Sequence, residues 1–427
     1  MKNYAIYLPA VNSFYPTAVQ KPFPVGRPVP EDITNEDLKF WTGKSNLWSH
    51  NHNLHSIGQY NVGSVPKNSL LERGKTDGVL LGDSAGFQLG KGKLKGTHGL
   101  TSGMSSDEAV AAWQDAYDVK IWIINWLETY CTHAMTIDIP LWSMLASNKA
   151  SYFHRCSEHE ILAMTLDNLK IIDSRPEGRT KWLNVIQATN LQDFRRWWDA
   201  VKWFKRGGWA LAGNAGWRGG LHDLLYVVLT MRDENAFKIG LDWLHVLGVS
   251  TPTWAVLLTA VMHGIQRTNP ALQVSYDSAS PFQEGGKWDK ASKPPAFDSN
   301  PDSWIIRSDT LEARRSYVNG NPVPFGYRSA LGKLLFMQHL TVDGDQYSSR
   351  RIDSLTNLFL VNHNLWVYID AFERANEIAF SDSRGSLPRD LAHALDAIEI
   401  IFAKPKQQWQ AELTSRKPVL DRVAKSP

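Results

Sequence analysis

Polar side chains and one glycine stand at the ends of short apolar segments, in a pattern that could assemble a catalytic site. The residues that end or follow these segments are Asp83, Asp138, Gln187, Gly213 and Asp277. Three carboxyl groups at one place can divide between them the roles of nucleophile, acid–base group and substrate recognition. This chemistry requires a fold that brings the segment ends together.

The apolar segments have the length and composition of buried parallel strands. They cover residues 78–81, 134–137, 182–186, 209–211, 243–247 and 272–276. Helical patterns lie between them, and several begin with recognisable caps. Ser105 with Glu108 and Ser157 with Glu160 have the spacing of capping boxes. Thr251 before Pro252 is typical of a helix start.

Alternation of strands and helices predicts an α/β fold with a parallel sheet. We expect a (β/α)8 TIM barrel, because its strands all end on one face and would bring the polar groups together. The expected organisation has three parts. Residues 1–75 are a loop-rich N-terminal segment that packs on the barrel, residues 76–310 form the catalytic barrel, and residues 311–427 form a helical C-terminal extension. A second loop-rich stretch covers residues 278–304.

The segment ends resemble a known family. DSAGFQ at 83–88 is similar to the DSGGFQ signature of the tRNA-guanine transglycosylases, TIM-barrel enzymes that exchange guanine for a 7-deazaguanine base. The resemblance keeps the family's order over about residues 78–287. Its other parts are MTIDIP at 135–140, VIQATN at 185–190, GWALAGN at 208–214, HVLGVSTP at 245–252 and VSYDSASP at 274–281.

This resemblance implies a role for each segment-end residue. Asp277 matches the nucleophile that attacks the sugar C1′ and expels guanine, and Asp83 matches the proposed acid–base group for the departing and incoming bases. The residues that it places around the base are Phe87, Asp138, Gln187 and Gly213. A carboxylate facing C1′ stabilises the positive charge that develops on the sugar and then captures it. Neither a redox cofactor, nor ATP, nor a metal is needed, so we expect no cofactor.

Departures from the family bear on the substrate. Cys131 and Cys156 are the two cysteines of the chain, too few for the Cys-rich zinc site of the tRNA enzymes. Gln283 and Gly286 replace arginines that contact tRNA phosphates, and Ala85 replaces a signature glycine. The chain therefore looks more like the bacterial and phage 7-deazaguanine DNA transglycosylases, and we expect DNA as the partner. The residues that we expect to contact nucleic acid are Lys287, Lys290, Arg314 and Arg315.

Other functions are compatible with the same residues. A tRNA-guanine transglycosylase of the queuosine or archaeosine type is the first alternative, and a catalytically silent nucleic-acid-binding subunit is the second. Taken singly, an Asp after a strand is usually a helix cap or turn residue. Gln187 could satisfy a buried backbone group, and Gly213 could serve only a tight turn.

A histidine cluster leaves a further alternative open. His50, His52 and His55 form an H-x-H-x-x-H pattern that could bind a metal, as in a metal-dependent barrel hydrolase. An exposed or substrate-contacting loop is the other interpretation, because the preceding residues make a poor strand and no partner ligands are evident downstream.

Composition restricts the class of protein. The chain has 427 residues, of which 43% are hydrophobic and 21% charged, typical of a folded domain and unlike a disordered, collagenous or disulfide-framework protein. Its net charge of +3 neither requires nor excludes a nucleic-acid partner. With no secretion signal pattern and few cysteines, we expect a cytoplasmic location and no membrane partner. The 18 tryptophans could fill the core or stack against bases.

Overall fold

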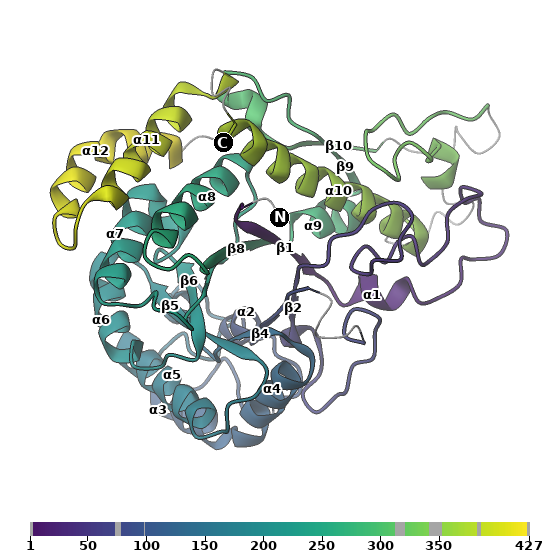
Figure 1. Cartoon of the computed structure of the whole chain (residues 1–427). Helices are drawn as coiled ribbons and strands as arrows, with labels where there is room; N and C mark the ends of the chain where they lie inside the picture. Colours follow the sequence, from purple (N-terminus) through teal and green to yellow (C-terminus); the bar gives the residue numbers. More distant parts are fainter. Residues whose placement is uncertain are drawn as a thin grey trace.

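Eight parallel strands close into a barrel in the order in which they occur in the sequence. This computed structural model describes residues 3–72, 78–97, 99–311, 321–340, 352–381 and 386–424. Figure 1 looks along the barrel, with the helices arranged around the strands. The strands are β1 (Ile6–Val11), β2 (Asn53–Ser56), β3 (Leu80–Asp83), β4 (His133–Met135), β5 (Lys181–Ala188), β6 (Gly207–Gly213), β7 (Trp243–Val246) and β8 (Gln273–Ser278). The expected α/β barrel is confirmed.

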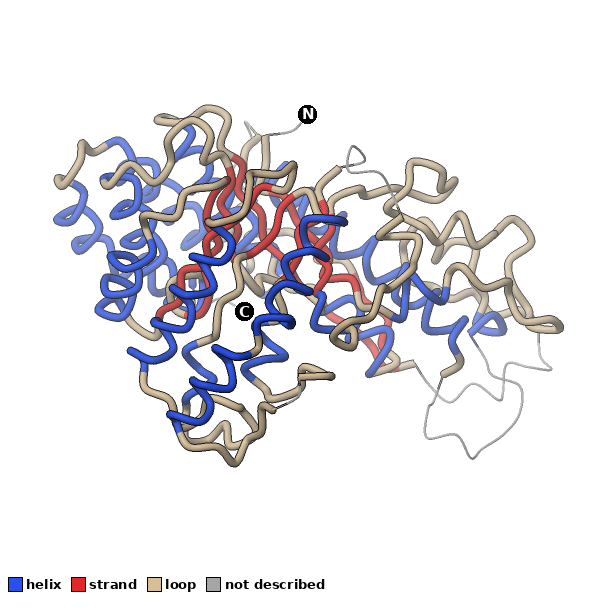
Figure 2. Tube along the Cα trace, turned by 90° about the horizontal axis from the view of Figure 1, so that it is seen from below, coloured by secondary structure: helices blue, strands red, loops and turns tan. Residues whose placement is uncertain are grey.

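Helices follow most of the strands and cover the outside of the barrel, as Figure 2 shows from below. They are α1 (Phe14–Ala18), α2 (Gly86–Gly90), α3 (Ser106–Asp115), α4 (Tyr117–Tyr130), α5 (Glu158–Asp173), α6 (Leu191–Val201), α7 (Gly220–Asp233), α8 (Pro252–Gln266), α9 (Ser280–Lys287), α10 (Ser354–Ala379), α11 (Arg389–Ala403) and α12 (Trp409–Ala424). All six predicted strands overlap barrel strands, β3 to β8.

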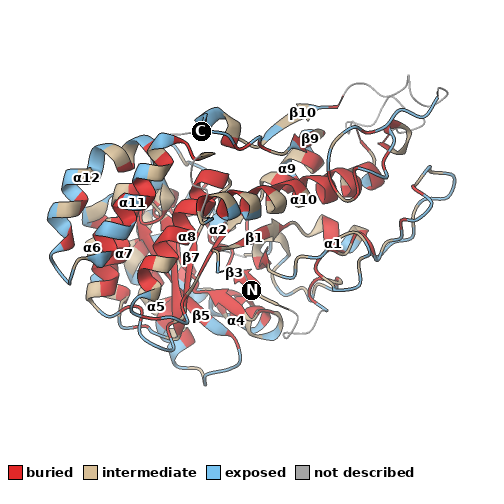
Figure 3. Ribbon diagram, turned by 45° about the horizontal axis from the view of Figure 1, so that its top comes forward, coloured by how far each residue is buried: buried red, intermediate tan, exposed pale blue. Residues whose placement is uncertain are grey.

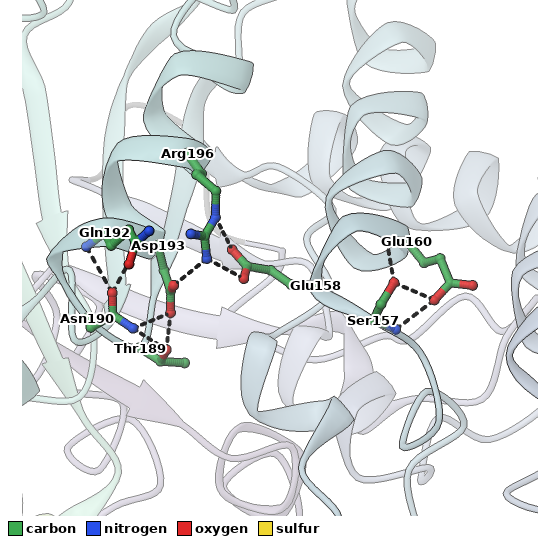
Figure 4. Close-up of polar contacts among 8 residues, drawn as sticks. All are labelled: Ser157, Glu158, Glu160, Thr189, Asn190, Gln192, Asp193 and Arg196. Atoms are coloured by element: carbon green, nitrogen blue, oxygen red, sulfur yellow. Dashed lines mark hydrogen bonds and ion pairs between the residues drawn. The ribbon is translucent and has the colours of Figure 1, made fainter.

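Side-chain caps fix where the helices begin. Ser157 and Glu160 form the predicted capping box of α5, and the box of Ser105 and Glu108 opens α3 in the same way. Asn190 caps α6, and Arg196 of that helix bonds Glu158 at the start of α5 at 2.7 Å (Figure 4). These contacts align the starts of two neighbouring helices on the face where the strands end.

The N-terminal boundary of the barrel is earlier than predicted. β1 and β2 lie within residues 1–75, which the sequence pattern assigned to a segment outside the barrel. β1 pairs with β8, placing Leu8 opposite Asp277, and β2 pairs with β3, placing Ser56 opposite Asp83. β2 is four residues long and stands among residues rich in proline, glycine and asparagine, so its periodicity is weak. β1 is an apolar run of six residues that contains Pro9, a residue that is unusual inside a central strand. The expected start of the barrel at residue 76 is therefore wrong.

The C-terminal helices belong to the wall around the barrel. α10 packs on α8, α9 and β1, while α11 packs on α8 and α12 packs on α7. α10 is buried along most of its length (Figure 3). The described part of the region is helical as expected, and its helices extend the outer layer around the barrel. The stretch 278–304 also contains regular structure, because α9 lies in it and β9 (Lys290–Lys293) pairs with β10 (Arg307–Thr310).

The core has two compartments. Leu8, Leu81, Met135 and Leu183 are among the apolar residues that fill the barrel interior, and a larger apolar cluster lies between the barrel and its helices. Most of the tryptophan surplus is explained by packing. The buried tryptophans are Trp41, Trp113, Trp126, Trp182, Trp197, Trp198, Trp209, Trp243, Trp254, Trp304 and Trp409.

The apolar stretch at 243–266 is divided between β7 and α8, both buried inside the fold. None of the helices in the described ranges has the length and apolar character that crossing a bilayer requires.

Candidate active site

One cavity of about 1210 Å³ opens where the barrel strands end. Its lining includes Asp83 from β3, Gln187 from β5, Gly213 from β6 and Asp277 from β8. Asp138, just after β4, and Phe87 in α2 complete the set. The barrel thus brings together the six residues to which the resemblance assigned catalytic or base-binding roles.

The two oxygens of Asp277 have different surroundings. Oδ1 accepts a hydrogen bond of 2.8 Å from the backbone N–H of Gly248, and it lies 3.2 Å from Nε2 of His245. Oδ2 has no hydrogen-bond partner among the described residues. The side chain is 15% exposed and lines the cavity. One carboxylate oxygen is therefore held by the protein while the other is available to a ligand.

Asp83 lies at the end of β3, beside Ser56 at the end of β2. Burial raises the pKa of Asp83 above its ordinary value, and the nearby carboxylate of Asp277 acts in the same direction. Hydrogen bonds from Ser56 and from the backbone of Ala85 oppose this rise. A carboxyl group with a raised pKa retains its proton to higher pH and can act as an acid.

The turn after Asp83 is strained at one residue. Ala85 has a φ of 75°, in the left-handed region that favours glycine. It is also fully buried. The position where the resembled signature has glycine is thus one where the backbone conformation itself calls for glycine.

Asp138 and Gln187 form a pair on neighbouring strands. Nε2 of Gln187 donates a hydrogen bond of 2.6 Å to Oδ2 of Asp138. Burial raises the pKa of Asp138 to about 7, although the bond from Gln187 acts to lower it. Gly86 makes room for this carboxyl group, because a Cβ there would lie 3.2 Å from Oδ1 of Asp138. The pair offers both donors and acceptors to a flat polar ligand.

Gly213 is required by the backbone. Its φ is 59°, and a Cβ at this position would lie 2.6 Å from the carbonyl oxygen of Ala188. The tight turn that the sequence left as an alternative is therefore present. It also leaves the Gly213 backbone lining the cavity.

Aromatic and basic side chains gather around the cavity. Phe87, Lys91, Trp142, Arg218 and Lys287 all line it, and we call this set the rim. Phe87 is 59% exposed, and its ring lies 5.7 Å from that of Trp142. The ammonium group of Lys91 lies over Trp142 at 5.0 Å. Within the described ranges, the three basic residues of the rim form no ion pair.

The other predicted contacts with nucleic acid have different outcomes. Lys287 belongs to the rim and lies over the ring of Trp288 at 5.7 Å. Lys290 lies over the same ring at 5.8 Å but does not line the cavity. Arg314 and Arg315 fall outside the described residues.

The three histidines of the N-terminal pattern make separate structural contacts. His55 is buried, with Nδ1 2.7 Å from the carbonyl oxygen of Val11 and Nε2 2.7 Å from the hydroxyl of Tyr60. His50 bonds the Tyr7 carbonyl through Nε2. His52 accepts from the backbone N–H of residue 79. The described ranges contain no group of three or more histidine, cysteine or acidic side chains arranged for a metal.

Three polar residues of the site were not predicted from the sequence: Ser56 beside Asp83, His245 beside Asp277, and Ser275, which bonds His245. Ser56 was missed together with its strand. His245 and Ser275 could have been found from the alternation of side chains along a strand. Ser275 lies two residues before Asp277, and His245 lies two residues after Trp243. Residues two apart in a strand share a face.

Comparison with known proteins gives no assignment. No protein-family model matches this chain, and no curated protein matches it. A functional interpretation therefore depends on the site itself and on the short motifs that line it.

Proposed function

We propose that this protein is a guanine transglycosylase that exchanges a guanine in DNA for a 7-deazaguanine base of the preQ0 type. The observation that carries this proposal is the meeting of Asp83, Asp138, Gln187 and Asp277 in one cavity, with Oδ2 of Asp277 free of partners among the described residues. The four residues come from the ends of four different strands, as expected for a barrel active site.

The reaction begins with the attack of Oδ2 of Asp277 on C1′ of the deoxyribose. The bond between Oδ2 and C1′ forms while the bond between C1′ and N9 breaks, and its electron pair leaves with guanine. Asp83 supplies the proton that the departing base needs, since its raised pKa favours the protonated form. In the second half, the incoming base attacks C1′ through its own nitrogen, gives its proton to Asp83 and releases Asp277.

Asp138 and Gln187 suit the recognition of a guanine edge. The carboxylate of Asp138 accepts hydrogen bonds from N1–H and the exocyclic amino group, a pattern that adenine does not offer. Gln187 orients this carboxylate through its bond of 2.6 Å. A 7-deazaguanine base has the same edge, so one pocket serves both the outgoing and the incoming base.

The composition of the rim favours a polyanionic substrate. Lys91, Arg218 and Lys287 make no ion pair among the described residues, whereas basic side chains elsewhere, such as Arg196 and Lys202, are paired with carboxylates. Unpaired cations next to exposed aromatic rings are typical of surfaces that bind nucleic acid. The cavity also exceeds the roughly 300–1,000 Å³ usual for small-ligand pockets. A nucleotide turned out of a duplex, with part of its strand, would occupy such a space.

Local geometry around α9 favours DNA over tRNA. Gly286 stands where the tRNA enzymes have a basic residue, and a Cβ there would lie 2.9 Å from Nδ2 of Asn357. A basic side chain at this position would therefore have to displace the amide of Asn357. Lys287, one residue later, reaches the cavity instead.

The test is incubation of the purified protein with a labelled 7-deazaguanine base and, separately, single-stranded DNA, duplex DNA and tRNA. We expect label in DNA, and none when Asp277 is replaced by Asn, which keeps an oxygen for the bonds to Oδ1. Label in tRNA alone would identify a tRNA enzyme. DNA binding without incorporation into any substrate would indicate the silent subunit.

A further inference from the structure

A buried row of polar side chains lies behind Asp277. β7 and β8 are paired so that His245 stands opposite Ser275, and both side chains are fully buried. Nε1 of Trp243 lies 2.7 Å from Oγ of Ser275, and the same Oγ lies 2.9 Å from Nδ1 of His245. Nε2 of His245 then lies 3.2 Å from Oδ1 of Asp277. Four side chains thus form one continuous hydrogen-bonded chain.

The direction of each bond follows from the chemistry of the groups. The indole N–H of Trp243 can only donate, so Oγ of Ser275 accepts from it. Among the described residues the remaining contact of that hydroxyl is Nδ1 of His245, which therefore accepts the Ser275 proton. The ring proton of His245 then lies on Nε2 and is donated to Oδ1 of Asp277. Each of the three donors in this row of side chains thus has an acceptor.

We infer that His245 is a positioning residue that makes Oδ2 of Asp277 the attacking atom and keeps the covalent intermediate short-lived. This inference rests on the proposed base exchange. Two N–H groups, from His245 and Gly248, occupy Oδ1, so that Oδ1 becomes the carbonyl oxygen of the sugar ester.

The effect on the intermediate follows from charge. Attack converts the negative carboxylate into a neutral ester, and release of the sugar returns the electron pair of the bond between C1′ and Oδ2 to the carboxylate. N–H donors bind the charged carboxylate more strongly than the ester carbonyl. His245 and Gly248 therefore make Asp277 a better leaving group. A base exchange needs this property, because the incoming base must displace the carboxylate in the second half of the reaction.

Two replacements of His245 separate this role from packing. His245→Leu removes the donor, whereas His245→Gln retains an N–H group that can reach Oδ1. We would isolate the denaturation-resistant protein–DNA complex and follow its decay after adding a 7-deazaguanine base. The complex of the Leu variant should accumulate and decay roughly tenfold more slowly, and that of the Gln variant should decay close to the wild-type rate. Equal decay of the Leu and wild-type complexes, or a Gln variant as slow as Leu, would overturn the inference.

A second measurement does not depend on the reaction. Nitrogen NMR of histidine-labelled protein should show His245 as a neutral ring protonated on Nε2, and Ser275→Ala should change its signals because Nδ1 loses its donor. A ring protonated on Nδ1 would contradict the proposed hydrogen-bond directions and the positioning role of His245. This result can be obtained even if the Leu variant fails to fold. A wild-type protein that forms no covalent complex would instead refute the proposed exchange, while the NMR result would still decide the proton arrangement.

Discussion

Gln187 donates a hydrogen bond of 2.6 Å to the buried carboxyl group of Asp138 and so joins the ends of two barrel strands at the cavity. The bond favours the charged form of Asp138, but burial acts more strongly in the other direction and leaves its pKa at about 7. The protonation state of the expected base-recognition site therefore changes near neutral pH. Two measurable consequences follow, one for ligand binding and one for stability.

Base affinity should depend on pH through Asp138. The carboxylate form accepts hydrogen bonds from the guanine edge, and the protonated form does not. Below the pKa of about 7, affinity for a 7-deazaguanine base should therefore fall by about tenfold for each pH unit. Calorimetric titration at pH 5, 6, 7 and 8 measures this. Asp138→Asn should bind weakly at every pH, and a wild-type affinity that is constant from pH 5 to pH 8 would contradict the role of Asp138.

The same group should lower the stability of the native state at high pH. Its pKa is about 7 in the folded protein against 3.8 for an unperturbed Asp, so the native state holds more protons than the unfolded chain between these values. The free energy of unfolding therefore falls as pH rises from about 4 to 7. Asp138→Asn should match the wild type near pH 4 and be more stable at pH 8, by as much as about 4 kcal/mol. Urea unfolding at the two pH values tests this, and an equal difference at both would refute it.

The sequence allows the later strands and their terminal carboxylates to be predicted because two signals agree there. Each segment from 78–81 to 272–276 is apolar, and four of the six are followed by an Asp or Gln side chain. The sequence alone therefore predicts that Asp83, Asp138, Gln187 and Asp277 lie close together, and all four line one cavity.

β1 carries its own signal in the apolar run Ile6–Val11, but β2 could not be predicted from its own residues. β2 is four residues long and contains Asn53, His55 and Ser56, polar side chains that the closed barrel buries although such residue types are usually exposed. Asp83 acquires Ser56 as a partner only when the barrel closes. The hydrogen-bonded side chains behind Asp277 could not be predicted for the same reason, because each bond between β7 and β8 depends on the register of the two strands. Pairing across strands is a tertiary property that a single segment does not contain.

Removal of the acid should affect substrates according to their leaving group. Asp83→Asn cannot donate a proton to departing guanine, and formation of the protein–DNA complex should slow by about 10²–10⁴-fold. 7-Methylguanine carries a positive charge in DNA and departs as a neutral base without a proton. The variant should therefore form the complex from DNA that contains 7-methylguanine almost as fast as the wild type. Equal slowing with both bases would show that Asp83 is not the acid.

The turn at Gly213 should tolerate no side chain. Alanine there would adopt a left-handed conformation at a cost of roughly 1–2 kcal/mol, and its Cβ would also press on the Ala188 carbonyl. Gly240 is the matched control, because its φ is 92° and a Cβ would meet nothing within 4 Å. Denaturant unfolding should show that Gly213→Ala destabilises the protein more than Gly240→Ala and also weakens base binding. Equal losses of stability in the two variants would show that the contact between the new Cβ and the Ala188 carbonyl does not destabilise the protein.

The rim lysines should contribute phosphate contacts that respond to salt. Lys91 and Lys287 are held over Trp142 and Trp288, and a neutral ring leaves the charge of each lysine available to a phosphate. Lys91→Gln and Lys287→Gln should each weaken DNA binding and reduce the slope of log affinity against log salt by roughly 0.7–0.9. Lys170→Gln is the control, because Lys170 is exposed on α5 and paired with Asp167. Fluorescence anisotropy with an oligonucleotide between 50 and 200 mM salt, roughly the range over which such contacts weaken, measures the slopes. Unchanged slopes in both rim variants would place the DNA backbone elsewhere on the protein.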